Sequence, residues 1–148
     1  MNETIAYMVT WTTYGTWLQG DKRGYVKDGK VLRGNYKLRE INKINQKGSK
    51  VKLSKSSREI VKKAILQEAL RIGHTIYAIE ICSNHVHLVA EYDGSEIGDA
   101  VSRYKNAGYF ALRKIGFKGR VWTKGFDKRY CFDEGELKAR IDYVNGHK

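Results

Sequence analysis

Residues 75–92 read TIYAIEICSNHVHLVAEY, and this segment carries the clearest signal for the fold. It contains two strand-like stretches, 75–82 and 85–92, which are separated only by Ser83 and Asn84. Short stretches rich in Ile, Val and Tyr that are bounded by turn-forming residues are typical of strands. The segment therefore predicts two neighbouring strands joined by a short turn.

The second of these strands carries a pair of histidines. Side chains alternate along a strand, so His85 and His87 share one face and stand about 6.6 Å apart along the backbone. The other face carries Val86, Leu88 and Ala90. We expect this apolar face to meet helices and the imidazoles to lie on the open face. Two neighbouring neutral imidazoles can bind one divalent metal ion, although a His-x-His pattern also arises by chance in strands.

The flanking sequence predicts the other elements. A strand is predicted over 5–12, where apolar and polar residues alternate. Ser56 and Glu59 have the spacing of a capping box at the start of a helix, and Gly73 is a suitable stop. The remaining predicted elements are a helix over 96–115, a strand over 126–132 and a helix that Asp133 caps together with Glu136.

The order of these elements predicts the fold class. Strand, helix, strand, strand, helix, strand is the order of the ferredoxin-like fold, an α+β fold whose antiparallel sheet carries both helices on one face. The chain of 148 residues suits one domain spanning 1–148, with the last helix added after the sheet. The polar segment 13–54, with a small hairpin predicted at Asp28 and Gly29, is longer than an ordinary connection and is of a kind that is often functional.

The composition points to a polyanionic partner. Lys and Arg number 28 against 16 Asp and Glu, a net charge of +12. Such a charge attracts nucleic acid first and an anionic membrane surface second, although Lys-rich surfaces also serve solubility alone. Cys82 and Cys131 do not form a disulfide framework and are expected to be buried free thiols.

The expected cellular location follows from the absence of a signal peptide and of a membrane-spanning segment in the given sequence. The N-terminus lacks a basic region followed by a long apolar stretch, so no signal peptide is expected. No apolar stretch approaches the roughly 20 residues that a membrane helix needs. We therefore expect a cytoplasmic, nucleoid-associated protein with no membrane partner.

A metal-bound phosphodiester needs a nucleophile, and the last predicted helix offers a tyrosine. Its inward face is formed by Leu137, Ile141 and Val144. Tyr143 points roughly 120° away from them and is not an obvious core residue. His147 follows one helical turn later and would share the face of Tyr143 as a third metal ligand. The simpler alternative is a surface tyrosine on a terminal helix.

These features together resemble the HUH single-tyrosine transposases of insertion-sequence type, including the REP-associated tyrosine transposases. The resemblance covers most of the chain. The matching stretches are YMVTWTTYGTW (7–17), SNHVHLV (83–89), SRYKNAGYF (102–110), GFDKRY (125–130) and IDYV (141–144).

The resemblance implies a chemistry and an assembly. His85 and His87 would hold Mg²⁺ or Mn²⁺, and Tyr143 would attack DNA to leave a free 3′-OH and a 5′-phosphotyrosine. The family usually has Asn or Gln where this chain has His147, which shifts the metal preference toward Mn²⁺ or later transition metals. Members of the family are homodimers, in which the tyrosine helix can act in trans, and they recognise hairpins and nearby single strands.

Two blocks rich in Lys and Arg, 43–63 and 103–129, are plausible tracks for DNA phosphates, with a solvated surface as the alternative for each. The rings of four aromatic residues near these blocks could stack on unpaired bases: Trp11, Tyr14, Trp17 and Trp122. Trp11 is expected in the core. The candidate DNA contacts are Lys52, Lys55, Arg103, Lys105, Arg120, Trp122 and Lys124.

Two other functions are open from the sequence. A domesticated, non-catalytic nucleic-acid-binding module would keep the charge and the sheet but form no covalent DNA adduct. A metal-dependent hydrolase of small phosphates would use His85 and His87 with Glu91, which alternates onto their face, and would need no tyrosine.

Overall fold

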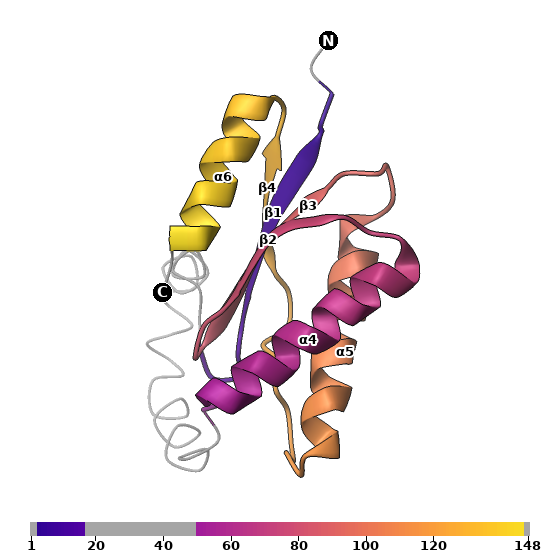
Figure 1. Ribbon diagram of the computed structural model, residues 1–148. Helices are drawn as coiled ribbons and strands as arrows, with labels where there is room; N and C mark the ends of the chain where they lie inside the picture. The colour runs from indigo at the N-terminus through magenta and orange to yellow at the C-terminus, as the bar shows by residue number, and fades with distance from the viewer. Residues whose placement is uncertain (1–2, 17–49, 147–148) are drawn as a thin grey trace, which may run out of the picture.

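The computed structural model describes residues 3–16 and 50–146. Its order of elements confirms the predicted strand, helix, strand, strand, helix, strand sequence followed by a helix (Figure 1). The elements are β1 (Ala6–Thr12), α4 (Lys55–Ile72), β2 (Ile76–Ile81), β3 (His85–Glu91), α5 (Ile97–Lys114), β4 (Asp127–Cys131) and α6 (Glu134–Gly146). The hairpin predicted at Asp28 and Gly29 lies outside the described residues.

The four strands form one antiparallel sheet in the order β2-β3-β1-β4, as in a ferredoxin-like fold. Helices α4 and α5 pack against each other on one face, and α6 lies across the opposite face (Figure 1). The predicted α+β class, with a C-terminal helix that carries the tyrosine, is therefore confirmed. The face that the sequence left open is covered by α6.

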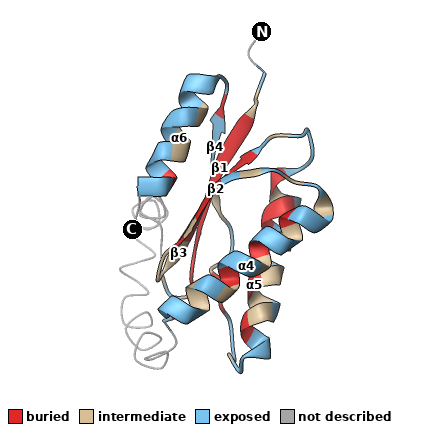
Figure 2. Cartoon of the chain, viewed as in Figure 1, coloured by how far each residue is buried: buried red, intermediate tan, exposed pale blue. Residues whose placement is uncertain are grey.

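Apolar side chains fill the space on both sides of the sheet, so the two central strands, β1 and β3, are buried along almost their whole length, whereas most of β4 is exposed (Figure 2). The larger core lies between the sheet and helices α4 and α5, where Val86, Leu88 and Ala90 pack as predicted. A smaller core lies beneath α6 and joins Val144 to Met8, Ala78 and Val89. The small core holds α6 in place over the strand of the histidines. Trp11 is fully buried in the larger core, as expected.

The helix ends are fixed by side-chain and backbone caps. Helix α4 is capped by Ser54, whose hydroxyl accepts the N–H of Ser57 at 3.1 Å, and not by the predicted capping box of Ser56 and Glu59. Ser54 takes this role because its backbone is extended directly before the helix. Gly73 ends α4 with φ 74°, as predicted.

Helix α6 begins with a reciprocal cap. The Glu136 N–H donates to Asp133 Oδ1 at 2.8 Å, and Glu136 Oε1 accepts the Phe132 N–H at 3.0 Å. This pairing confirms the cap predicted from Asp133 and Glu136 and sets the angle at which α6 leaves β4.

Both cysteines are free thiols, with Cys131 buried and Cys82 partly buried. None of the described helices is long and apolar enough to cross a bilayer.

Candidate active site

The antiparallel register places the two histidines in rows that run across the sheet. His87 lies opposite Thr10 of β1 on one side and Glu80 of β2 on the other. His85, one row further along β3, lies opposite Thr12. Directly opposite residues in an antiparallel pair project to the same face. These side chains therefore share the face that α6 covers.

The two imidazoles face each other closely. Their ring centroids are 4.5 Å apart, at an interplanar angle of 76°. His85 is partly buried, and His87 is only 6% exposed. The two histidines share one face of the sheet, as predicted, but helix α6 covers this face, which was expected to be open.

A hydrogen bond to the Nδ1 atom orients each of the two rings. His87 Nδ1 lies 2.9 Å from Thr10 Oγ1, and His85 Nδ1 lies 2.6 Å from Asn84 Oδ1. An amide oxygen only accepts, so the His85 Nδ1 carries the proton in this bond. A metal would then bind His85 through Nε2, which is the usual arrangement for metal-binding histidines whose Nδ1 is held by the protein. The same holds for His87 only where its Nδ1 donates to Thr10, because the threonine hydroxyl can either donate or accept. The donor set fits one divalent cation.

Tyr143 lies over this pair. Val144 is fully buried, and Leu137 and Ile141 pack beside it against the sheet, as the helical periodicity predicted. The Tyr143 ring is 49% exposed and makes an edge contact with His87 of the same chain, at 5.6 Å between ring centroids. Helix α6 therefore brings the candidate nucleophile to the candidate metal pair without help from a second chain.

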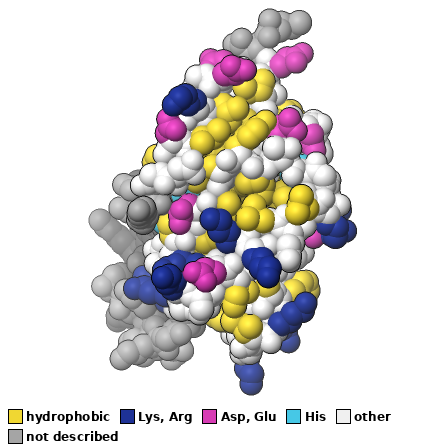
Figure 3. Space-filling model, viewed as in Figure 1, with side chains coloured by type: hydrophobic (Ala, Val, Ile, Leu, Met, Phe, Trp, Pro, Cys, Tyr) yellow, Lys and Arg dark blue, Asp and Glu magenta, His cyan; other side chains and the backbone are white. Residues whose placement is uncertain are grey.

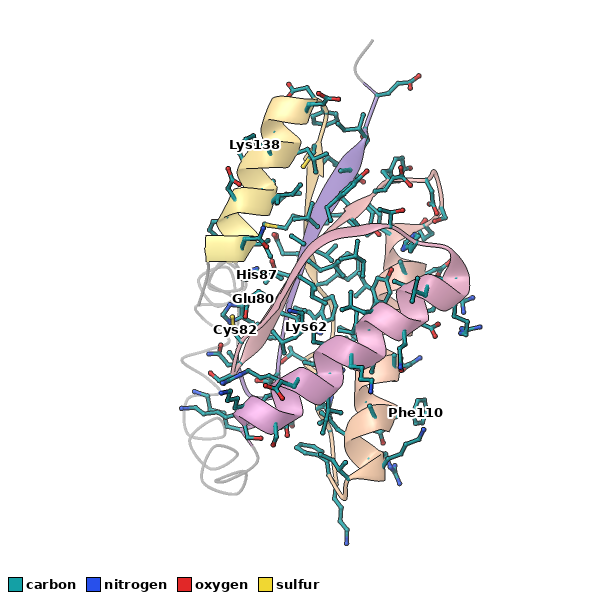
Figure 4. All side chains as sticks on the ribbon, in the orientation of Figure 1. Lys62, Glu80, Cys82, His87, Phe110 and Lys138 are labelled. Atoms are coloured by element: carbon teal, nitrogen blue, oxygen red, sulfur yellow. The ribbon has the colours of Figure 1, made fainter. Side chains whose placement is uncertain are left out.

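Two other side chains near the histidine pair are possible further metal ligands. Glu80 and Cys82 project near His87, close to the last turn of α6 (Figure 4). Burial raises the pKa of the Cys82 thiol, Glu80 adds to this effect, and Arg58 opposes it. A protonated thiol is a poor ligand for a hard cation. Within 3–16 and 50–146 no three His, Cys, Asp or Glu side chains group to hold a metal.

The structure bears differently on two further side chains of the predicted site. His147, the predicted third ligand, lies outside the described residues. Glu91 pairs with Ala6 at the far end of β3, about 13 Å along the strand from His87, so it cannot share a metal with the histidines. This placement removes the side chain on which the alternative hydrolase depended.

Two of the predicted DNA contacts have other roles in the structure. The Trp122 ring is only 7% exposed, packs edge-on against Trp11 at 6.0 Å and donates its indole N–H to Lys105 O. It is therefore not offered to a base, which corrects the stacking role expected from the sequence. The Lys105 ammonium donates to the carbonyls of Thr123 and Gly125 at 3.0 and 2.7 Å, so its hydrogen bonds are made within the chain.

The other predicted contacts are exposed. Lys52 and Lys55 lie on either side of Leu53, whose N–H donates to Ser83 O at 2.7 Å, close to the turn that precedes His85. Most Lys and Arg side chains visible in Figure 3 lie over the same end of the molecule, around the start of α4 and the end of α5. The other exposed candidate contacts are Arg103, Arg120 and Lys124.

Sequence reasoning missed Thr10 and Glu80. Neither residue stands near His87 in the sequence, and only the pairing of β1 and β2 with β3 brings them beside it. The available signal was the alternation of β1, in which Thr10 follows Met8 on one face.

Comparison with known proteins adds to this geometry. No protein-family model and no curated protein sequence matches the chain. Among the solved structures that are similar to this chain are the following two. A REP-associated tyrosine transposase bound to a REP hairpin has a TM-score of 0.55 and 12% identity, covering 97% of this chain and 67% of that one. A protein described as a transposase from Deinococcus radiodurans R1 has a TM-score of 0.57 and 14% identity, covering 97% and 91%.

Both neighbours are matched over almost the whole of this chain at low sequence identity, so the likeness concerns the arrangement of the elements. It agrees with the resemblance seen in the sequence. The chain shares its fold with a REP-associated tyrosine transposase.

Proposed function

We propose that this protein cuts and rejoins single-stranded DNA, with Tyr143 as the nucleophile and a divalent cation, Mg²⁺ or Mn²⁺, on His85 and His87. One observation carries the proposal: the Tyr143 ring contacts the ring of His87, 5.6 Å between centroids, while remaining 49% exposed. A phenol in that place can meet both a solvent-borne phosphodiester and a cation on the imidazoles. A purely structural tyrosine would not need to satisfy both conditions.

The chemistry follows from these groups. A bound cation would polarise the phosphodiester and neutralise charge that develops on its oxygens. Tyr143 Oη forms the new bond to phosphorus, the bond from phosphorus to the 3′-oxygen breaks, and the released strand leaves with a 3′-OH. The fragment on the 5′ side of the broken bond is the one released, and the remaining fragment stays attached to the protein as a 5′-phosphotyrosine. Attack by a 3′-OH on that ester reverses the step, exchanging one phosphodiester for another, so no nucleotide cofactor is needed.

The proposed substrate is single-stranded DNA that contains a hairpin. The structural neighbour with a REP hairpin bound supports this choice, as does the net charge of +12. Lys52, Lys55, Arg120 and Lys124 are exposed and would contact phosphates, contributing affinity more than sequence choice. We also propose that the protein works as a homodimer in association with the nucleoid.

The test uses 3′-labelled single-stranded hairpins of varied stem and flanking sequence with Mn²⁺, resolved on denaturing gels. The unsubstituted protein should give a covalent protein–DNA band. Tyr143→Phe should remove the band and the nicking while hairpin binding stays nearly intact, because only the nucleophilic oxygen is lost. Tyr130→Phe is the matched control, since Tyr130 pairs with Tyr7 on the other face of the sheet and is also exposed.

His85→Ala should abolish metal-dependent nicking and leave hairpin binding in place. An adduct that persists in Tyr143→Phe would refute the assignment of the nucleophile. Undiminished nicking in His85→Ala would refute the metal pair. Hairpin binding by the unsubstituted protein with no adduct under any divalent metal would instead identify a non-catalytic binding module.

A further inference from the structure

Thr10 stands in an unusual place for a hydroxyl. It is only 5% exposed, in the middle of β1, on the face where its neighbour Met8 belongs to the small core beneath α6. A buried hydroxyl is costly unless it is hydrogen-bonded. The bond that the structure gives the Thr10 hydroxyl is to His87 Nδ1, at 2.9 Å, across the strand pair and 77 residues away in sequence.

The direction of this hydrogen bond decides which nitrogen of His87 can bind a metal. A threonine hydroxyl can either donate or accept. If Thr10 accepts, Nδ1 carries the ring proton and the Nε2 lone pair points away from the strand. If Thr10 donates, the proton moves to Nε2 and metal binding there is blocked. A cation on Nε2 thus requires the first arrangement.

We propose that Thr10 is a positioning residue that holds His87 as the Nδ1–H tautomer and aims its Nε2 at the cation. The proposal rests on the function proposed above. Asn84 does the same for His85 through an amide oxygen, so each ring is held by a hydrogen bond to its Nδ1. Thr12 is the next residue on that face of β1. Its hydroxyl donates to the carbonyl oxygen of Thr16 at 2.7 Å and not to a histidine.

The experiment measures Mn²⁺ affinity of the full chain without DNA, by calorimetry and by loss of the free Mn²⁺ signal in electron paramagnetic resonance. Thr10→Val keeps the shape of the side chain and removes the hydroxyl. We expect it to weaken Mn²⁺ binding by about 10–100-fold, as losses of such orienting partners do. Thr10→Ser keeps the hydroxyl and should bind Mn²⁺ nearly as well as the unsubstituted protein.

Two comparisons make the result decisive. Thermal unfolding of both variants without metal reports any purely structural effect, and affinity at a temperature well below both midpoints is compared. A Thr10→Val protein that binds Mn²⁺ as tightly as the unsubstituted one, while His87→Ala does not bind, overturns the role of Thr10 and leaves the metal pair standing. Failure of the unsubstituted protein to bind Mn²⁺ overturns both. Equal weakening in Thr10→Val and Thr10→Ser also overturns the role of the hydroxyl.

Discussion

Lys105 is half-buried between α5 and the segment that follows Trp122, and its ammonium donates to two backbone carbonyls. Burial, with a smaller contribution from Arg120, lowers its pKa from 10.5 to about 8. Between these values the unfolded chain binds more protons than the folded chain, so this group makes stability rise as the pH rises. Below the folded pKa the cost of burying the charge is fully present.

We therefore expect Lys105→Met to flatten the pH dependence of the unfolding free energy between about pH 8 and 10. The measurement is urea unfolding of both proteins across that range. The range stops near pH 10 because burial raises the pKa of Tyr7 to about 12, which makes stability fall with pH once the unfolded tyrosine ionises. Parallel pH curves for the two proteins would contradict the assignment.

At the scale of residues, the sequence could locate groups whose position depends on local periodicity. Alternation placed His85 and His87 together, and helical spacing separated Tyr143 from the inward face of α6. It could not locate Thr10, because cross-strand register depends on the whole sheet. It also misjudged Trp122, since a large ring between basic residues can equally well be core.

Gly108 of α5 lies close to both α4 and the 121–123 segment. A Cβ there would lie 3.2 Å from Trp122 Cζ2 and 3.3 Å from Val61 Cγ1. Gly108→Ala should destabilise the protein, because overpacking costs about 1–3 kcal/mol while the gain in helix propensity is only about 1 kcal/mol. Denaturant unfolding would measure the difference.

The same helix supplies a control for this prediction. Gly98 lies in the first turn of α5, and a Cβ there would meet its nearest neighbours at 3.9 Å, an ordinary contact. Gly98→Ala should leave stability unchanged or raise it by up to about 1 kcal/mol. If Gly108→Ala proves as stable as Gly98→Ala, the close approach of the helices does not limit the size of this residue.

The elements themselves were largely predictable, with ends shifted by a residue or two. Helix α4 is the instructive exception, because Ser54 and Ser56 both offer a capping hydroxyl and the choice depends on backbone angles that the sequence does not state. The docking of α6 was better determined. Leu137, Ile141 and Val144 form a short apolar stripe, and a stripe of that width has to meet an apolar surface.

At the scale of the molecule, the order of elements was enough to predict the ferredoxin-like sheet, because that topology brings β1 between β3 and β4. The order did not show that α6 returns over its own sheet. A terminal helix with one apolar stripe can pack on the sheet of its own chain or on the sheet of a second copy, because the same apolar contacts form in both cases. The distinction matters because it decides which chain completes each proposed site.

In this structure Tyr143 contacts His87 of its own chain, so we expect catalysis in cis. Chains carrying Tyr143→Phe and His85→Ala, with different tags, would be co-expressed and the mixed assembly purified through both tags. In cis neither chain has a complete site, so no adduct should form on hairpin DNA. In trans, Tyr143 of the His85→Ala chain would meet the intact histidines of the other, and the adduct would carry that chain's tag. Such an adduct would show that α6 exchanges between copies, and that the contact seen here belongs to one of two states of the helix. Recovery of no mixed assembly at all would mean that the chains do not pair, and a single chain would then have to supply the whole site.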